Sequence, residues 1–331
     1  MKYSIATIPG DGIGTEVMAA AVRVLEALAE RTDLEFEFSL LFAGDEHKER
    51  TGTALPPETV EGVKASDACL FAAVGDTAKE VIIPLRQRLN LYANLRPAKA
   101  YPGVPAINPD VDIMIVRENT EGIYKMIGDR GRNYGFNVRV ITREASERIV
   151  RYAFEYAKKN GKSKVSAVHK ANVLDYTDEV FLEAARDVAK DYPGVVYEEV
   201  IVDACAMKLV LAPQQFQVIV TTNMFGDILS DEAAGLVGGL GMAPSGNVGD
   251  ELCIFEPVHG SAPDIAGKGI ANPVATILSA AMMLEWLGEK EAADRVEAAV
   301  LKVLEEGEVR TPDLGGANTT DDLADAVIEK L

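Results

Sequence analysis

The sequence predicts an α/β protein in which strands and helices alternate and the strands pair largely in parallel. Short β-rich runs alternate with segments whose apolar residues repeat at helical spacing, and this rhythm continues almost to the end of the chain. The 331 residues are enough for about two domains of ordinary size. With 48% hydrophobic and 26% charged residues, the chain can pack an interior, which excludes wholesale disorder.

The predicted strands and helices follow one another along the chain. A strand at 3–8 precedes a helix at 16–30, where Val17, Ala21, Leu25 and Leu28 lie on one face. Later strands are expected at β-rich runs, namely 34–42, 68–74, 112–117, 138–142, 164–169 and 195–202. Further helices are expected at 143–159, at 178–190 and over most of the chain from residue 272. The apolar stretch 273–287 contains Glu285 and is too short to cross a membrane, so it indicates a buried helix.

The charge balance limits the possible partners. With 33 Lys and Arg against 52 Asp and Glu, the net charge is −19, which repels nucleic acid and anionic membrane surfaces. A small anionic substrate would therefore need a local cluster of basic residues. The first residues lack the zones of a signal peptide, so we expect a cytoplasmic protein. Cys69, Cys205 and Cys253 are far apart, and we expect them to be buried small hydrophobes rather than a disulfide or zinc site.

A glycine-rich segment, residues 9–14, separates the first strand from the first helix. Such a turn can bring backbone N–H groups close to a ligand. The dinucleotide fingerprint fails, because Thr15 stands where its last glycine belongs and no Asp or Glu closes the second strand at Phe42. A tight structural turn and a ligand-binding loop both remain open.

Two groups of charged residues are candidates for a site. Arg86, Arg96 and Arg117 could each clamp a carboxylate with two hydrogen bonds, although each alone is an ordinary ion-pair residue. Asp227 and Asp231 are four residues apart and share one helical face, where a divalent cation would offset their repulsion. The alternative is that these acids, near the N-terminus of the helix, only stabilise it through a favourable interaction with its dipole. Asp203, at a strand end, is a third candidate metal ligand.

Three further positions have both an ordinary and a functional interpretation. Lys170 falls at a strand end, from which open α/β sheets present functional groups, but it could also be a surface lysine. Tyr124 is a core aromatic or a proton donor. The loop 256–264 combines small residues with His259 and an acid, and a single histidine is more often structural than catalytic.

Taken together, these segments resemble the β-decarboxylating dehydrogenases, the family of isopropylmalate, isocitrate and homoisocitrate dehydrogenases. The matching motifs occur in order nearly end to end, at 10–14, 94–97, 116–124, 170–172, 223–231 and 256–264. The resemblance implies a two-domain fold that is not a Rossmann fold, with residues 1–95 and 237–331 in one domain and 96–236 in the other. It also implies a homodimer in which Lys170 and Asp203 complete the neighbouring subunit's cleft. Further assembly to a tetramer is left open.

The resemblance also assigns roles to the candidate residues. Arg86, Arg96 and Arg117 would clamp the two malate carboxylates. Asp227 and Asp231, with the neighbour's Asp203, would bind Mg²⁺ or Mn²⁺, and Asp203 would also lie against the substrate. Lys170 would help to remove the hydroxyl proton, and Tyr124 would protonate the enol left after loss of CO₂.

The resemblance further implies the cofactor. NAD would bind in a site lined by Glu256, His259, Gly260, Ser261, Ala262, Asp264 and Asn272. Because the carboxylate of Asp264 can accept hydrogen bonds from ribose hydroxyls and repels a 2′-phosphate, NAD is expected rather than NADP.

The substrate is expected to be 3-isopropylmalate, which would place the enzyme in leucine biosynthesis. Ile82 and Ile83, four and three residues before Arg86, would face the variable group from the first turn of their helix, where an isopropyl group packs better than a third carboxylate. Homoisocitrate and isocitrate are the alternatives. A non-catalytic regulatory subunit would lack some of these side chains, and a kinase or NTPase would need a P-loop lysine that is missing. Two departures from the family pattern are His169 and the short segment 125–137.

Overall fold

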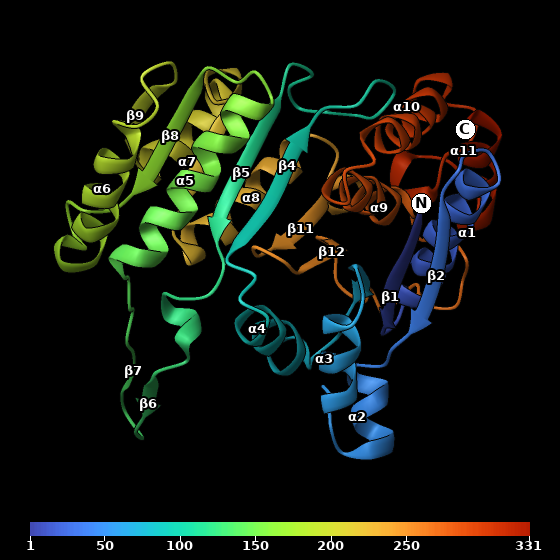
Figure 1. The fold of residues 1–331 in the computed structure, drawn as a ribbon, viewed down its shortest axis with the longest axis horizontal. Helices are drawn as coiled ribbons and strands as arrows, with labels where there is room; N and C mark the ends of the chain where they lie inside the picture. Colours follow the sequence, from blue (N-terminus) through green and yellow to red (C-terminus); the bar gives the residue numbers. More distant parts are fainter.

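Ten strands form one continuous sheet across the molecule (Figure 1). The computed structural model describes all 331 residues, and the strand order is β2-β1-β3-β12-β11-β4-β5-β10-β8-β9. The bounds are Lys2–Gly10 (β1), Glu35–Leu40 (β2), Ala68–Ala73 (β3), Ala93–Lys99 (β4), Asp112–Glu118 (β5), Lys164–His169 (β8), Val196–Ile201 (β9), Val218–Thr221 (β10), Pro244–Val248 (β11) and Cys253–Pro257 (β12). Six of the nine pairs are parallel, which confirms the largely parallel pairing.

The centre of the sheet departs from the parallel pattern. β4 pairs antiparallel with both β5 and β11, and β11 pairs antiparallel with β12. A doubly wound dinucleotide-binding sheet is parallel throughout its nucleotide-binding halves. The expectation of a fold that is not a Rossmann fold is therefore confirmed.

Eleven α-helices cover the sheet, and those from the first and last parts of the chain lie together at one end with both termini (Figure 1). The bounds are Gly14–Ala29 (α1), Asp45–Thr51 (α2), Pro57–Lys64 (α3), Ala78–Arg88 (α4), Arg143–Lys159 (α5), Asp175–Ala189 (α6), Val202–Leu211 (α7), Asn223–Leu236 (α8), Val274–Trp286 (α9), Lys290–Glu306 (α10) and Thr320–Lys330 (α11). α9 is buried on nearly all sides, as its apolar sequence predicts. The predicted face of α1 is also buried, and all three cysteines are buried and free.

The strand expected at 138–142 is not formed. A short hairpin precedes it instead, with β6 at Gly128–Arg130 and β7 at Gly135–Asn137, and only Val140 makes an isolated bridge, to Gly122. Thr142 caps α5, since its side chain accepts from the N–H of Ala145 and donates to Glu121 at 2.9 Å. Thr142, the last β-branched residue of this run, therefore begins a helix rather than ending a strand.

The predicted domain division stays a prediction. Its first boundary falls inside β4, which joins β11 on one side to β5 on the other, and its second falls at the end of α8. None of the helices is both long enough and apolar enough to span a membrane.

Candidate active site

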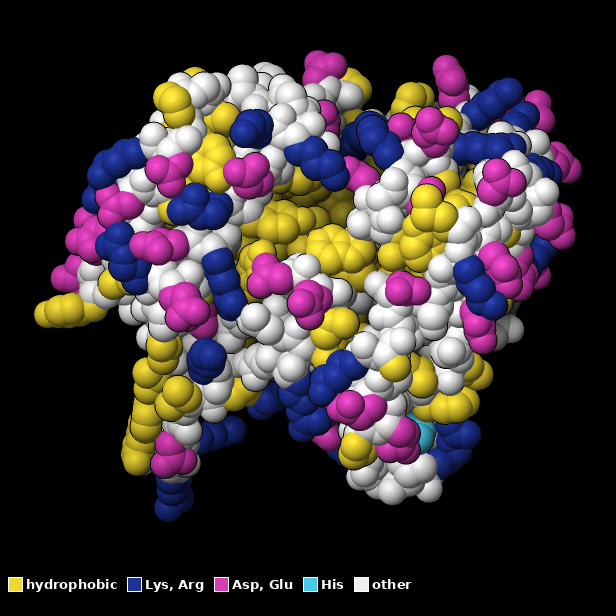
Figure 2. Space-filling model, viewed as in Figure 1, with side chains coloured by type: hydrophobic (Ala, Val, Ile, Leu, Met, Phe, Trp, Pro, Cys, Tyr) yellow, Lys and Arg dark blue, Asp and Glu magenta, His cyan; other side chains and the backbone are white.

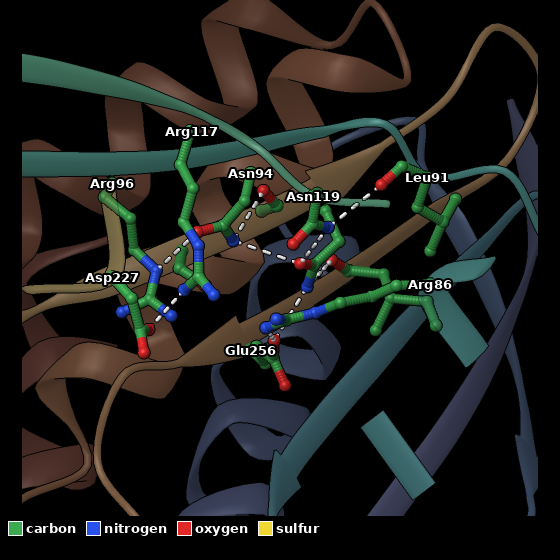
Figure 3. A network of polar contacts seen from close by, with 12 residues as sticks. Arg86, Leu91, Asn94, Arg96, Arg117, Asn119, Asp227 and Glu256 are labelled. Carbon is green, nitrogen blue, oxygen red and sulfur yellow. Dashed lines mark hydrogen bonds and ion pairs between the residues drawn. The ribbon is translucent and has the colours of Figure 1, made fainter. Parts of the chain in front are cut away.

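Three arginines from three different elements converge on one face of the sheet (Figure 3). Arg86 comes from the last turn of α4, Arg96 from β4 and Arg117 from β5. Arg117 lies opposite Asn94 in the antiparallel β4–β5 pair, so Arg96, two residues further along, points to the same face. All three are buried, with exposed fractions of 9%, 8% and 1%. This is the local basic cluster that a small anionic substrate requires in so acidic a chain.

A buried carboxylate neutralises one of these arginines. Nη2 of Arg86 donates to Oε1 of Glu256 at 2.9 Å, and both side chains are almost fully buried. The same carboxylate oxygen accepts from the Asn247 amide at 2.7 Å. Glu256, expected to line the cofactor site, therefore lies directly against the arginine cluster.

Buried amides extend this contact to the second arginine. Oδ1 of Asn247 accepts from the side-chain amides of Asn94 and Asn119, each at 3.0 Å, and Oδ1 of Asn94 accepts from Nε of Arg96 at 2.8 Å. Figure 3 shows this chain of contacts between Arg86 and Arg96. The sequence analysis assigned no role to Asn247 or to Asn119, although the latter lies in the motif 116–124; the signal that could have found Asn247 is an asparagine within a fully buried strand.

Two guanidinium nitrogens remain without hydrogen-bond partners. Nε of Arg86 and Nη1 of Arg96 are both buried and unpartnered, although the latter lies 3.7 Å from a carboxylate oxygen of Asp231. Burial and the neighbouring Arg117 and Arg86 lower the pKa of Arg96 to about 10. Burial and Arg86 likewise lower the pKa of Arg117. Unmatched buried donors that repel one another form a strong site for an anion.

Arg117 also holds the first residues of α8. Asn223 accepts from Nη2 of Arg117 at 2.7 Å, and Asp227, one turn later, accepts from its Nη1. A Cβ atom on Gly226 would lie 2.6 Å from the Arg117 side chain, so only glycine lets the helix approach this closely. The approach places both aspartates of α8, Asp227 and Asp231, beside the arginines.

Tyr124 joins this group, because its hydroxyl donates to Oδ2 of Asp227 at 2.8 Å. Burial raises the pKa of Tyr124; the hydrogen bond to Asp227 adds to this effect and Arg117 opposes it. Burial also raises the pKa of Asp227, but Arg117 and Tyr124 outweigh it, so that the net pKa lies below its ordinary value. For Asp231, burial dominates and raises the pKa.

Asp227 and Asp231 have the chemistry of a site for Mg²⁺ or Mn²⁺. Their side chains lie one turn apart on α8 and are 45% and 56% exposed, so hard carboxylate oxygens can reach a cation. In the single chain, no group of three or more His, Cys, Asp or Glu side chains is arranged to hold a metal. Two carboxylates alone do not complete a site for either cation, and the third ligand expected from a neighbouring subunit stays a prediction.

Lys170 and Asp203 form a separate pair. Lys170 follows β8, Asp203 lies in the first turn of α7, and their Nζ and Oδ1 atoms are 2.6 Å apart. The hydrogen bond from Lys170 lowers the pKa of Asp203. Within one chain these two side chains contact each other and none of the three arginines.

The loop expected to bind the cofactor has one buried polar atom without a partner, Nε2 of His259. Burial lowers the pKa of this histidine, which keeps the ring neutral. Asp264 is exposed, whereas Asn272 is buried and donates to Asp313 at 2.9 Å. An unpartnered ring nitrogen and a free carboxylate in one loop fit hydrogen bonds to a nucleotide.

The glycine-rich turn is a structural turn packed against this loop. The N–H of Ile13 donates to the carbonyl of Ser261 at 2.9 Å, and a Cβ atom on Gly12 would lie 2.1 Å from that oxygen. A Cβ atom on Gly10 would lie 1.7 Å from the Ala73 carbonyl oxygen. The glycines therefore serve close backbone packing, and they position the loop that carries Gly260 and Ala262.

The two isoleucines lie in the second turn of α4, not in the first as expected. Asp45 accepts from the N–H groups of Asp76 and Thr77 at 2.9 and 2.8 Å, which fixes the start of the helix at Ala78. Ile82 packs against the hydrophobic core, whereas Ile83 is half-buried and belongs to none of the core clusters. Both side chains are partly exposed, and that both face the substrate stays a prediction.

The buried guanidinium cluster, with carboxylates and a phenol at its edge, defines a protein that binds a small polyanion on an α/β scaffold. The sequence profile of the isocitrate/isopropylmalate dehydrogenase family matches residues 4–327. The chain belongs to this family and is a β-decarboxylating dehydrogenase, so the non-catalytic alternative is set aside.

Known relatives support this assignment over the full length. A 3-isopropylmalate dehydrogenase from Archaeoglobus fulgidus is 56% identical, covering 99% of both chains. An isocitrate/homoisocitrate dehydrogenase from Thermus thermophilus is also 56% identical, covering 100% of this chain and 99% of its own. A crystal structure of isocitrate dehydrogenase from Methylococcus capsulatus superposes with a TM-score of 0.95 at 45% identity, covering 99% of both chains. Relatives with different substrates are thus equally similar.

Proposed function

We propose that this enzyme catalyses the oxidative decarboxylation of 3-isopropylmalate, with NAD and Mg²⁺ or Mn²⁺, as a step of leucine biosynthesis. The observation that carries the proposal is the convergence of Arg86, Arg96 and Arg117, with buried donors left free for an anion. Members of this family typically use NAD(P) and a divalent metal. The cytoplasmic location expected from the sequence stays a prediction.

The chain's own residues have distinct roles in this reaction. The arginines bind and orient the two malate carboxylates, which fixes the substrate's hydroxyl-bearing carbon in place. The partner subunit's Lys170 takes up the hydroxyl proton as that carbon loses its hydride, and Tyr124 gives a proton to the carbon that loses CO₂. NAD would accept the hydride, and a cation held by Asp227, Asp231 and the partner subunit's Asp203 would supply positive charge beside the hydroxyl.

The cofactor preference rests on the loop after β12. Asp264 is exposed there, and its carboxylate would accept hydrogen bonds from the adenosine ribose and repel a 2′-phosphate. His259 offers a neutral ring nitrogen without a partner. These groups support NAD over NADP, with Glu256, Gly260, Ser261, Ala262 and Asn272 completing the site.

The substrate preference rests on α4. Ile83 is an apolar side chain beside the site, where burying an isopropyl group contributes about 1.5–3 kcal/mol. Glu80, one turn earlier, is paired with Lys48 at 2.6 Å and carries a charge of the wrong sign for a third carboxylate. Leaving a carboxylate unpaired against Ile83 would cost several kcal/mol.

Homoisocitrate or isocitrate is the second candidate substrate. The Thermus thermophilus relative named for both is as similar to this chain as the Archaeoglobus fulgidus enzyme. An enzyme could meet the distal carboxylate from a loop outside α4.

A homodimer would bring the separate halves of the site together. α7 and α8 expose large hydrophobic side chains that a second copy would bury, among them Met207, Val210, Leu211 and Ile228. The same face carries Asp203, so an isologous contact would place it against the partner's α8. This supports the proposed dimer with shared sites; further assembly is left open.

NADH formation with 3-isopropylmalate tests the proposal. We expect one CO₂ released per NADH, a higher kcat/KM with NAD than with NADP, and loss of activity in excess EDTA that Mn²⁺ restores. Asp227→Asn should reduce kcat/KM by about two orders of magnitude or more. Full activity in excess EDTA, or a higher kcat/KM with NADP, would contradict the metal and cofactor assignments.

A further inference from the structure

A cavity of about 800 Å³ lies on the face of the sheet opposite to the three arginines. Its floor consists of β4, β5, β11 and β12, and its walls are α5 on one side and α9 and α10 on the other. Figure 2 shows the hollow between these walls, with hydrophobic side chains over its floor and charged side chains around its mouth. The volume is within the range of small-molecule sites.

The cavity is separate from the active site although both use β4. Side chains alternate along a strand, so Leu95, Pro97 and Lys99 line the cavity, whereas Asn94 and Arg96 face the other way. No residue assigned to the substrate, metal or cofactor lines the cavity. The proposed function therefore does not account for this cavity.

Its lining is unusually aromatic. Five of its 24 lining residues are aromatic, in a chain with only 6% aromatic residues. They are Tyr101, Tyr152, Tyr156, Phe255 and Trp286, the last being the only tryptophan of the chain. Wide flat apolar side chains of this kind favour a ring-shaped ligand.

The four lysines at the mouth of the cavity are each paired with an acidic side chain of its lining. Lys159 lies 3.0 Å from Glu285, and Lys290 lies 2.8 Å from Asp294. The other two lysines, Lys99 and Lys162, are likewise paired with Glu297 and Asp112. No free cation is left for a phosphate or carboxylate, which argues against an anionic ligand.

Of the other lining groups only Glu155 is charged; its carboxylate accepts from the hydroxyl of Tyr192 at 2.6 Å, and the remaining polar groups are neutral. The hydroxyls of Tyr101, Tyr152 and Tyr156 have no hydrogen-bond partner in the protein, and burial raises the pKa of each, so they stay protonated donors. The indole N–H of Trp286 is a donor of the same kind. A ligand that accepts hydrogen bonds would satisfy them.

We propose that this cavity is a second binding site, for an uncharged aromatic molecule of one or two rings that carries hydrogen-bond acceptors. The proposal does not depend on the reaction assigned above. A bound molecule would contact α5 on one side and α9 and α10 on the other, and it would lie beside Trp286.

Prodan, an uncharged naphthalene with one carbonyl group, is a suitable probe. On titration into the full-length protein, its emission should shift to the blue, and the emission of Trp286 should be quenched nearly completely at saturation. The anionic naphthalene sulfonate ANS should bind at least about tenfold more weakly. Saturating 3-isopropylmalate with NAD and Mn²⁺ should not displace prodan.

Variants locate the probe. Ala281→Phe fills the cavity and should weaken prodan binding by about tenfold or more, whereas Ala298→Phe, on the exposed side of α10, should leave it within about twofold. Trp286→Phe keeps the cavity intact and should retain prodan binding. It should abolish the tryptophan emission that bound prodan quenches by energy transfer. This second variant keeps the proposal testable if Ala281→Phe does not fold.

Three results would overturn the proposal: no blue shift, equal or tighter binding of ANS, or displacement by the substrate mixture. Blue-shifted prodan emission with unquenched Trp286 would place the probe elsewhere and would overturn it as well.

Discussion

Arg86 and Glu256 form a buried ion pair at 2.9 Å, although 170 residues separate them in the sequence. The pair joins the last turn of α4 to β12 and lowers the net positive charge of the arginine cluster by one. Arg117 is paired with Asp227 in the same way, so Arg96 is the one guanidinium of the three without a hydrogen-bonded carboxylate. Because Asn247 binds the same oxygen of Glu256, the position of Arg86 depends on a residue that contacts no arginine.

The first prediction concerns Asn247. Asn247→Leu should lower the free energy of unfolding by about 1–3 kcal/mol, because Glu256, Asn94 and Asn119 lose a buried partner. It should also raise KM for the malate substrate more than it lowers kcat, since Arg86 and Arg96 lose their relative positions. Urea unfolding and steady-state kinetics measure the two effects. Thr276→Val, which removes a buried hydroxyl without a partner, is the control and should change neither; equal effects in both variants would refute the positioning role.

The second prediction concerns the acidity of Tyr124. Burial raises its pKa, the hydrogen bond to Asp227 raises it further, and Arg117 lowers it. Asp227→Asn removes the carboxylate and keeps the arginine, so the pKa of Tyr124 should fall. Absorbance titration of tyrosinate detects this change, and the double variant with Tyr124→Phe isolates the signal. An unchanged or higher pKa would show that Asp227 does not hold the phenol proton.

Local pattern was enough to predict most of the helices and strands, and the motifs identified the arginines. Their convergence did not follow from pattern, because no strand was expected at 93–99, and it is the antiparallel β4–β5 pair that places Arg96 and Arg117 on one face. The connection through Asn247 could not be predicted, because it joins three strands whose order is set by the whole sheet. The start of α4 was misplaced for a similar reason: the side chain of Asp45, distant in sequence, fixes it.

The glycine-rich turn shows another limit of local pattern. Its glycines suit a ligand loop and a tight turn equally well. Only the distances to the Ser261 and Ala73 carbonyls show that neighbouring backbone fills the space. The run 138–142 was misassigned because its last β-branched residue, Thr142, caps α5 and only Val140 makes a bridge.

The third prediction tests whether subunits share their sites. Lys170→Met and Asp227→Asn should each be nearly inactive as homodimers. If Lys170 serves the partner's site, a mixed dimer contains one site with both native residues, so mixing and refolding should restore activity. Kinetics of the separated mixed dimer measure this. Activity no higher than that of the parent variants would show that Lys170 serves its own chain or that no such dimer forms.

The fourth prediction concerns the two isoleucines of α4. Ile83→Arg should reduce kcat/KM for 3-isopropylmalate by about tenfold or more, because the isopropyl group loses its apolar contact. Ile82→Val is the control: it should cost about 1 kcal/mol of stability, since Ile82 packs in the core, and leave substrate preference unchanged. Unchanged isopropylmalate kinetics in Ile83→Arg would mean that the pocket lies elsewhere.

The measurement that tests the central claim most directly is the ratio of kcat/KM values for 3-isopropylmalate, homoisocitrate and isocitrate, each with NAD and Mn²⁺. Since Ile83 offers an isopropyl group an apolar contact and would leave a third carboxylate unpaired, 3-isopropylmalate should have the highest value, by about tenfold or more. A value for homoisocitrate or isocitrate that equals or exceeds that for 3-isopropylmalate would contradict the proposed function.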